Sequence, residues 1–195
     1  MWRGQTGVIS FIVSVFDRTL PLYCLLPSLM LQEPPWEIIV TDASTDPGVQ
    51  AIHRAAAEWV GARYLSTPGL DCYADAEKAI PLATGTWICL PNDDGYYVPG
   101  FAQTMRQAAR EHGWDLVYCD LVYDPRLAGV YEVLRVVPKL MGIDKTCFIV
   151  RRSVMPPVFP GKDVNWKFCD GWLVEQLVKA GVRHGKAPGV MVVHN

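Results

Sequence analysis

Short apolar segments rich in β-branched residues alternate with helical patterns along the first half of the chain, and no other feature limits its fold as strongly. The strand-like segment 8–15 is followed by a helical pattern at 20–31, and the strand-like segment 36–42 by a helical pattern at 49–60. Such alternation is typical of a parallel sheet with helices on both faces. We therefore predict an α/β fold, Rossmann-like, with a doubly wound, mixed and mostly parallel central sheet flanked by helices.

The remaining expected elements follow the same two patterns. They are strands within residues 62–65, 86–90, 115–123, 131–137, 142–151 and 189–194, and helices at 73–83, 101–112 and 170–180, with a proline-rich loop over 155–166. In the helix at 49–60, the amphipathic pattern predicts that Ile52, Ala56, Trp59 and Val60 face the core. The same pattern predicts that His53 lies on the surface.

Length and composition favour a single folded domain over residues 1–195. Of these residues, 50% are hydrophobic and 19% are charged, so the chain can bury a sizeable core. The net charge is -2, and the basic residues form no run. We therefore expect no nucleic acid as a partner.

The cysteines and the first apolar stretch bear on the cellular compartment. None of the six cysteines lies in a spacing typical of zinc ligands: Cys24, Cys72, Cys89, Cys119, Cys147 and Cys169. We expect reduced thiols in a cytoplasmic protein. The apolar stretch near the N-terminus stops at Asp17, and the next contains Pro21 and Pro27, so we expect no transmembrane segment. Peripheral association with a membrane stays open as an alternative.

An acidic turn follows the apolar segment 86–90. It contains Asn92, Asp93 and Asp94 and lies at the end of a predicted core strand, where open α/β sheets bind their ligands. Adjacent carboxylates repel each other unless solvent or a cation compensates their charge. Mg²⁺ and Mn²⁺ prefer carboxylate oxygens and often bind substrate phosphates as well. The turn is therefore either a metal–diphosphate site or a solvated turn before a helix.

Five segments in this order resemble glycosyltransferase family 2. WEIIVTDASTD at 36–46 is similar to the family's EIIVVDDGSTD, and AEKAIPLATG at 76–85 to its ARNxGIxxAxG. NDDGYYVPGF at 92–101 stands where the family has its aspartate-x-aspartate motif. CDGWLVEQLVKAG at 169–181 resembles an acceptor-side helix, and VMVVHN at 190–195 a closing strand. The resemblance implies a GT-A fold and an inverting transferase that uses nucleotide sugars.

The chain also departs from the family pattern. Pro91 stands where many members have the first aspartate of the motif, and Cys169 stands where many have an acidic residue before the catalytic one. Glu77 and Lys78 replace the arginine and asparagine of the ARN triplet. These differences favour an alternative in which the chain is a catalytically silent GT-A-like module that binds a glycan or a partner.

The resemblance assigns donor binding to about residues 1–98 and acceptor binding to about residues 99–195. It implies that the turn at Val15, Phe16 and Asp17 borders the nucleobase of the donor. Asp42 would accept a hydrogen bond from a uracil or guanine N–H. Asp75 and Lys78 would reach the ribose or the diphosphate. By residue type alone, helix starts, loop caps and solvated helix faces explain these residues as well.

The acidic turn would then hold a Mn²⁺ or Mg²⁺ ion and part of the donor. The resemblance implies Asp94 as the first metal ligand, Asp93 as a metal or ribose ligand, and Asn92 as a donor contact. His194 is a further candidate ligand, since imidazole nitrogen suits Mn²⁺. Tyr96 and Tyr97 line the donor pocket or belong to the core.

The acceptor side would contain the catalytic base. The resemblance implies that Asp170 takes the proton of the acceptor hydroxyl, and that the sugar is transferred in a single displacement with inversion. As an alternative, Asp170 stabilises the helix N-terminus. Asp144 and Trp172 are candidate acceptor contacts, each with a structural alternative.

The resulting hypothesis is a metal-dependent inverting glycosyltransferase. The family favours a UDP-sugar as donor, and the acceptor would be a glycan, lipid-linked or small-molecule hydroxyl. A homo-oligomer is not excluded. A nucleotidyltransferase or a Rossmann dehydrogenase would need a glycine-rich loop after the first strand, whereas residues 15–19 contain no glycine.

Overall fold

The computed structural model describes residues 7–20, 22–123, 130–156 and 169–194. Most of the loop expected at 155–166 lies outside these ranges. The helices are α1 (Leu22–Met30), α2 (Pro47–Trp59), α3 (Cys72–Ala79), α4 (Phe101–His112) and α5 (Cys169–Lys179), with short 3₁₀ turns η1 (Ile80–Leu82), η2 (Lys145–Cys147) and η3 (Arg152–Val154). The strands are β1 (Ile9–Val15), β2 (Trp36–Asp42), β3 (Arg63–Ser66), β4 (Trp87–Cys89), β5 (Gly95–Tyr97), β6 (Leu116–Tyr123), β7 (Glu132–Leu134), β8 (Phe148–Arg151) and β9 (His184–His194).

One mixed sheet connects all the described strands. Its order is β3-β2-β1-β4-β8-β6-β9-β5, and β7 pairs with β6. The longest ladders, β1 with β2 and β6 with β9, are parallel. Strands β8, β7 and β5 run antiparallel to their neighbours. The predicted α/β class and mixed, mostly parallel sheet are confirmed, whereas β5 was not predicted because three residues after a turn carry no periodic signal.

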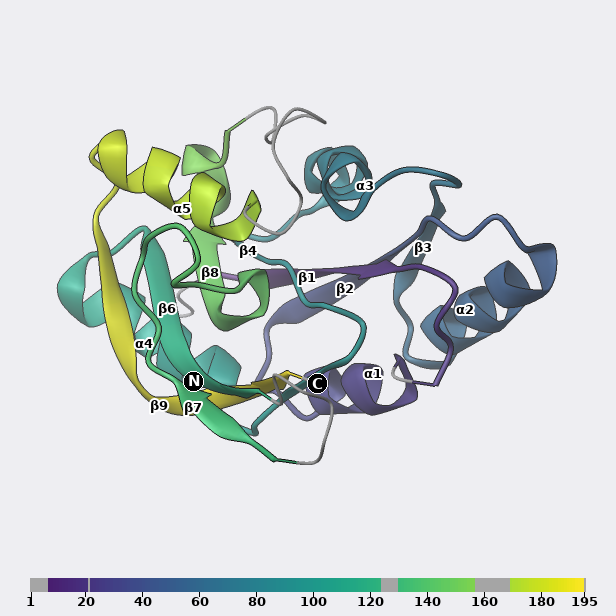
Figure 1. The fold of residues 1–195 in the computed structure, drawn as a ribbon, viewed down its shortest axis with the longest axis horizontal. Coiled ribbons are helices and arrows are strands. Elements are labelled where there is room, and N and C mark those ends of the chain that lie inside the picture. The colour runs from purple at the N-terminus through teal and green to yellow at the C-terminus, as the bar shows by residue number, and fades with distance from the viewer. Residues whose placement is uncertain (1–6, 21, 124–129, 157–168, 195) are drawn as a thin grey trace.

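The helices cover the two faces of the sheet in the manner of doubly wound folds. In Figure 1, α1 and α2 lie on one side of the strands β1, β2 and β3, and α3 lies on the other. The chain thus reverses its winding between β1 and β4, which are neighbours in the sheet. At such a switch point the loops after adjacent strands separate and leave a crevice at their carboxyl ends.

Tyr97 anchors the acidic turn to the core. Its ring is fully buried and makes edge contacts with Phe11 and Phe101, at centroid distances of 5.9 and 4.7 Å. Its hydroxyl donates to the carbonyl oxygen of Thr146 at 2.7 Å, and its backbone N–H donates to Ser28 Oγ at 3.1 Å. Tyr97 is therefore a core residue, and it fixes the strand that follows Asp93 and Asp94. Tyr96, the next residue back, is partly exposed.

The prediction for the inward face of α2 was partly wrong. His53 is 0% exposed, whereas Ile52 and Trp59 are exposed. Ala56 is buried as predicted. The helix is rotated relative to the hydrophobic pattern because His53 pairs with Asp42 at the end of β2, beneath the helix. An ion pair between distant residues leaves no periodic signal in the sequence.

No helix among the described residues combines the length and the apolar character that a membrane span requires.

Candidate functional site

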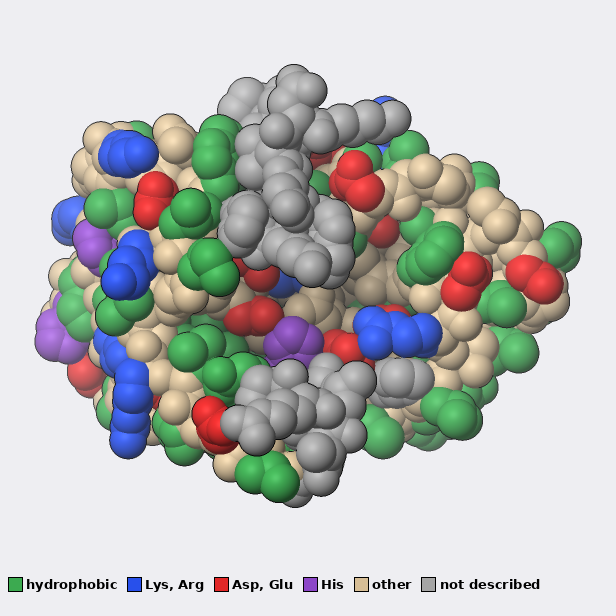
Figure 2. All heavy atoms as spheres, viewed as in Figure 1, with side chains coloured by type: hydrophobic (Ala, Val, Ile, Leu, Met, Phe, Trp, Pro, Cys, Tyr) green, Lys and Arg blue, Asp and Glu red, His purple; other side chains and the backbone are tan. Residues whose placement is uncertain are grey.

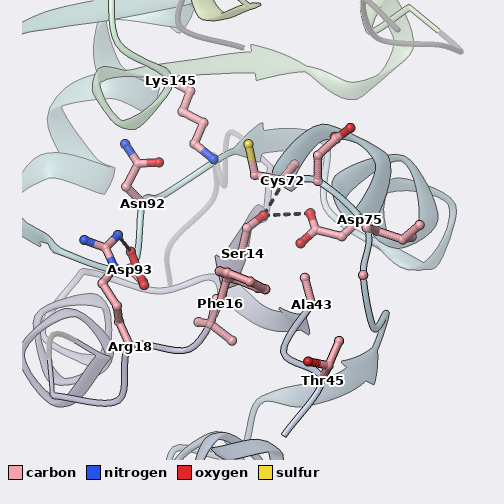
Figure 3. Close-up of a pocket in the computed structure, with 14 residues that line it drawn as sticks. Ser14, Phe16, Arg18, Ala43, Thr45, Cys72, Asp75, Asn92, Asp93 and Lys145 are labelled. Atoms are coloured by element: carbon pink, nitrogen blue, oxygen red, sulfur yellow. Dashed lines mark hydrogen bonds and ion pairs between the residues drawn. The ribbon is translucent and has the colours of Figure 1, made fainter. Parts of the chain in front are cut away.

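A cleft of about 610 Å³ opens beside the carboxyl ends of β1 and β2. It lies at the crevice that the sheet topology predicts. In the space-filling view, acidic, basic and histidine side chains gather around a hollow near the centre of the molecule (Figure 2). The cleft is lined by Ser14, Val15, Phe16, Arg18, Ala43, Thr45, Gly69, Leu70, Asp71, Cys72, Asp75, Asn92, Asp93 and Lys145. Figure 3 shows how these side chains surround the central space.

The acidic turn faces an arginine from the loop after β1. The Arg18 guanidinium forms an ion pair with Asp93 Oδ1 and a second one with Asp94 Oδ2 at 2.9 Å. Asp93 is 4% exposed, and burial raises its pKa although the charge of Arg18 opposes this shift. The two carboxylates are thus compensated by a cation, as their adjacency in sequence requires.

His194 connects the acidic turn to the acceptor side of the site. Its Nε2 lies 3.3 Å from Asp94 Oδ1, and its Nδ1 lies 3.1 Å from Asp144 Oδ2. Burial would lower the pKa of His194, but the two carboxylates raise it to about 10, so the imidazole is protonated at neutral pH. Antiparallel pairing of β5 with β9 places Gly95 opposite His194, which explains this contact. The structure therefore brings Asp94, Asp144 and His194 together.

Asp144 also orders the turn before β8. Its Oδ1 accepts hydrogen bonds from Thr146 N at 2.8 Å and from Thr146 Oγ1 at 2.6 Å. The Asn92 amide lies 3.5 Å from the same oxygen. Asp144 is therefore the N-cap of η2, and it lies close enough to Asn92 and His194 to belong to the same polar cluster.

Asp170 joins this cluster from the start of α5. Its Oδ2 accepts a hydrogen bond from Lys145 N at 2.9 Å. Burial raises the pKa of Asp170 to about 6, although the Lys145 N–H and the charge of His194 oppose this shift. A carboxylate with a pKa near 6 is ionised at neutral pH and is a better proton acceptor than an ordinary aspartate.

Asp75 points into the cleft from α3. It is fully buried, and its Oδ1 accepts a hydrogen bond from Ser14 Oγ at 2.8 Å (Figure 3). Burial raises the pKa of Asp75 to about 7, although Ser14, Lys145 and Thr41 oppose this shift. At neutral pH this carboxyl group can therefore either donate or accept a hydrogen bond.

Asp42 does not reach the cleft. It is fully buried, and its oxygens accept hydrogen bonds from Ser44 N at 2.9 Å and from Tyr64 Oη at 2.7 Å. His53 Nδ1 lies 3.1 Å from Asp42 Oδ2, and its Nε2 lies 3.2 Å from the Arg18 carbonyl oxygen. Burial alone would raise the pKa of Asp42, but the hydrogen bonds lower it to about 2. These neighbours occupy the carboxylate, and Asp42 is not among the residues that line the cleft, so its contact with a base stays a prediction.

Tyr64→Phe tests the strength of this buried cluster. The substitution removes one hydrogen bond to a buried carboxylate, so we expect the free energy of unfolding to fall by about 1–3 kcal/mol. Tyr23 is exposed on α1, and for Tyr23→Phe we expect a change below about 0.5 kcal/mol. Urea denaturation of both variants measures the difference. Equal small changes would show that the Tyr64 hydroxyl does not stabilise the fold.

The other predicted donor residues are divided between the cleft and its surroundings. Val15 is buried in the cleft wall, and Phe16 is 55% exposed at the cleft. Asp17 has a left-handed backbone with φ of 53° and is not among the lining residues. Lys78 lines a separate cavity with Thr67 and Pro68. The structure thus brings Val15 and Phe16, but not Asp17 or Lys78, to the cleft.

Trp172 is partly buried and packs against the hydrophobic core. This position fits the structural alternative, and its contact with an acceptor stays a prediction.

The sequence analysis assigned no role to Arg18 or Lys145, although both line the cleft. Arg18 follows a predicted strand end, and Lys145 follows Asp144 in a turn before an apolar strand. The signal in the sequence that could have identified them was the position of a basic residue next to a predicted strand. Neither lies in a motif, so their convergence on the cleft depended on the tertiary structure.

The described residues contain no ready-made group of three or more His, Cys, Asp or Glu side chains that could hold a metal. The donor types nevertheless fit Mn²⁺ or Mg²⁺, since Asp93 and Asp94 are adjacent carboxylates that both contact Arg18, and the His194 imidazole lies 3.3 Å from Asp94. The guanidinium of Arg18 contacts both carboxylates and marks the place as one that attracts a cation. Such ions are commonly held by one or two carboxylates together with substrate phosphates.

Solved structures with a similar fold include S. aureus TarS and a mannosyltransferase. S. aureus TarS 1–349 is 17% identical, with a TM-score of 0.74, over 96% of this chain and 60% of that fragment. The same TarS fragment in complex with UDP-GlcNAc is 16% identical, with a TM-score of 0.73, over 95% of this chain and 57% of that one. The mannosyltransferase PcManGT from Pyrobaculum calidifontis, in complex with GDP-Man and Mn²⁺, is 20% identical, with a TM-score of 0.76, over 95% of this chain and 56% of its own.

These likenesses define the fold class as GT-A-like. The chain spans about 60% or less of the length of these three structures. No curated protein matches its sequence. The model of the family described as glycosyl transferase family 2 matches residues 10–156, and the chain belongs to this family.

Proposed function

We propose that this chain is a glycosyltransferase that transfers a sugar from a nucleotide-diphosphate sugar to a hydroxyl acceptor with inversion, in a metal-dependent reaction. The observation that carries the proposal is the cleft at the carboxyl ends of β1 and β2, with Asn92 and Asp93 of the acidic turn in its wall. The fold neighbours include complexes with UDP-GlcNAc and with GDP-Man, which supports a nucleotide sugar as the donor.

The donor would bind with its base near Val15 and Phe16 and its ribose near Asp75 and Asp93. Phe16 is an exposed aromatic ring at the cleft, which suits stacking on a planar base. Asp42 would act on the base only through the loop that it holds at Ser44. Residues up to about 98 would form this donor half, and the following residues the acceptor half. A UDP-sugar is the preferred donor because the family favours it.

Asp94 and His194 would hold a Mn²⁺ or Mg²⁺ ion, with Asp93 as a further ligand. A bound divalent cation neutralises the negative charge that develops on the leaving diphosphate. Arg18 would have to release Asp94, and His194 would have to lose its proton, because a histidine ligand is neutral. Metal affinity is therefore expected to rise with pH.

Asp170 would be the general base. It would accept the proton of the acceptor hydroxyl while the acceptor oxygen attacks the anomeric carbon from the face opposite the diphosphate. The bond between that carbon and the diphosphate oxygen breaks, and its electron pair stays on the oxygen. Asp144 borders the same side of the site and would contact the acceptor. This single displacement inverts the anomeric configuration.

A catalytically silent module that binds a nucleotide, a glycan or a partner is the second candidate. It is favoured by the ion pairs of Arg18, which already neutralise the acidic turn.

Calorimetric titration of UDP and GDP, with Mn²⁺ and with a chelator, tests the proposed function. We expect one of the two nucleotides to bind and its affinity to fall when the metal is removed. Binding without any turnover of the corresponding sugar nucleotide would favour the silent module. If neither nucleotide binds under any condition, the proposed function is wrong.

A further inference from the structure

We infer that Lys145 binds the diphosphate of the donor, and that its positively charged ammonium group stabilises the diphosphate as it leaves. This inference rests on the proposed function, and it assigns a specific role to one residue of the cleft. Its starting point is the unusual position of this lysine, which is 5% exposed yet lines the cleft.

The backbone of Lys145 is held rigidly at the cleft. The preceding residue, Asp144, is the N-cap of η2 and fixes Thr146, while Asp170 accepts a hydrogen bond from the Lys145 N–H. The side chain extends from this turn into the cleft, on the side of Asn92 and Cys72 (Figure 3). Asp144 and Asp170, on the proposed acceptor side, therefore orient the Lys145 side chain toward the donor side.

The ammonium group of Lys145 is buried without a direct ion pair. No carboxylate oxygen of the residues that the structure describes lies within 4.0 Å of Nζ. The ring of Tyr73 lies near the ammonium group, with the ring centroid 5.6 Å from Nζ. Burial raises the pKa values of Asp75 and Asp93, and the charge of Lys145 is among the influences that oppose this rise.

A buried ammonium group without a close partner is costly for the fold. Lysine is rarely fully buried unless it is paired, because the charge loses its hydration. Apolar side chains of similar shape usually stabilise such positions. A lysine at this position therefore indicates an anionic ligand that completes the pair when it binds.

The chemistry of the cleft restricts that ligand. Lys145 and Asn92 offer N–H donors at one end, while Val15, Phe16 and Leu70 offer apolar surface for a planar ring. A ligand that carries both a ring and phosphate oxygens satisfies both ends, as a nucleoside diphosphate does. During transfer, the bond between the anomeric carbon and the β-phosphate oxygen breaks with its electron pair on that oxygen. The Lys145 ammonium donates hydrogen bonds to the diphosphate that gains this charge.

Lys145→Met tests this role by comparing ligands that differ in phosphate content. Uridine, UMP and UDP, and the matching guanine series, are titrated into the wild type and the variant with Mn²⁺ present. We expect the affinity for the diphosphate to fall at least about tenfold, and the affinity for the nucleoside to change less than about twofold. We also expect the melting temperature of Lys145→Met to stay equal or rise, because a buried charge is removed.

Lys179→Met is the matched control, since Lys179 is exposed near the C-terminal end of α5 and pairs with Glu175. Equal affinity of wild type and Lys145→Met for the diphosphate would overturn the inference, and so would an equal loss for nucleoside and diphosphate. Inorganic pyrophosphate separates the two proposals. If neither UDP nor GDP binds, but the wild type binds pyrophosphate and Lys145→Met binds it about tenfold more weakly, Lys145 is a diphosphate-binding residue, whereas the proposed function and the role of Lys145 toward a nucleotide donor fail.

Discussion

Asp94→Asn is expected to reduce sugar transfer by about 10²–10³-fold. The Asp94 carboxylate contacts both Arg18 and His194. Burial would raise the pKa of Asp94, but the contact with His194 outweighs burial and lowers it. The carboxylate is therefore charged at neutral pH. The substitution keeps the size of the side chain but removes the charge that would hold a divalent cation. Metal-dependent nucleotide binding should therefore weaken together with the rate. Release of nucleoside diphosphate from UDP-GlcNAc or GDP-Man, with water as the acceptor, measures the rate.

Asp46→Asn is the matched control for this substitution. Asp46 is the exposed N-cap of α2, and asparagine caps helices about as well as aspartate. Its activity should equal that of the wild type. Because Asp94→Asn also breaks two ion pairs, its thermal unfolding is measured alongside. A folded Asp94→Asn protein with wild-type activity and unchanged metal dependence would exclude Asp94 as a metal ligand.

Asp170→Asn is expected to lower the transfer rate by about 10²–10⁴-fold while nucleotide binding stays unchanged. An amide cannot accept the proton of the acceptor hydroxyl. Lys145 N–H, which donates to Asp170 Oδ2, can still donate to the amide oxygen. The variant therefore separates catalysis from binding. A parallel loss of nucleotide affinity would indicate that Asp170 only supports the turn of Lys145.

The pH profile gives a second signature of Asp170. The base acts only when ionised, and the pKa of Asp170 is raised to about 6 by burial, so the wild-type rate should fall about tenfold per pH unit well below pH 6. Above this pH the contribution of Asp170 is constant. The charged and titratable groups that affect or face it are His194 on β9, Lys145 on η2 and Cys72 on α3. This decline should be absent from the residual activity of Asp170→Asn. If the variant keeps the same decline, another group titrates.

Apart from β5, the order of the strands and helices could be predicted from the sequence because each of them carries a local signal. β2 and α4 begin and end at the predicted residues, and β1, β3, β4 and β6 lie within a residue or two of their predicted bounds. The position of Asp93 and Asp94 at the carboxyl end of the sheet followed from the same signal. The antiparallel direction of β8 could not be predicted, since strand direction depends on which loops cross the sheet.

The composition of the cleft was predicted only in part. Val15, Phe16, Asp75, Asn92 and Asp93 line the cleft, and their contacts with a donor stay predictions. Asp42 was expected at the cleft but is enclosed by Ser44, His53 and Tyr64. A motif places a residue at a strand end, but the neighbours that its side chain meets come from other parts of the chain.

The sequence by itself determined the alternation of strands and helices, the acidic turn and the likeness to a family, because these features depend on residues close together in the chain. The tertiary structure decided that His194 meets Asp94 through the pairing of β5 with β9, and that Lys145 enters the cleft from η2. It also decided that His53 is buried against Asp42. The contacts of His194 and the position of Lys145 bring together residues that lie far apart in sequence, whereas His53 and Asp42 belong to consecutive elements. The physical reason why local patterns do not predict them is that side-chain contacts between elements impose no periodicity on the sequence.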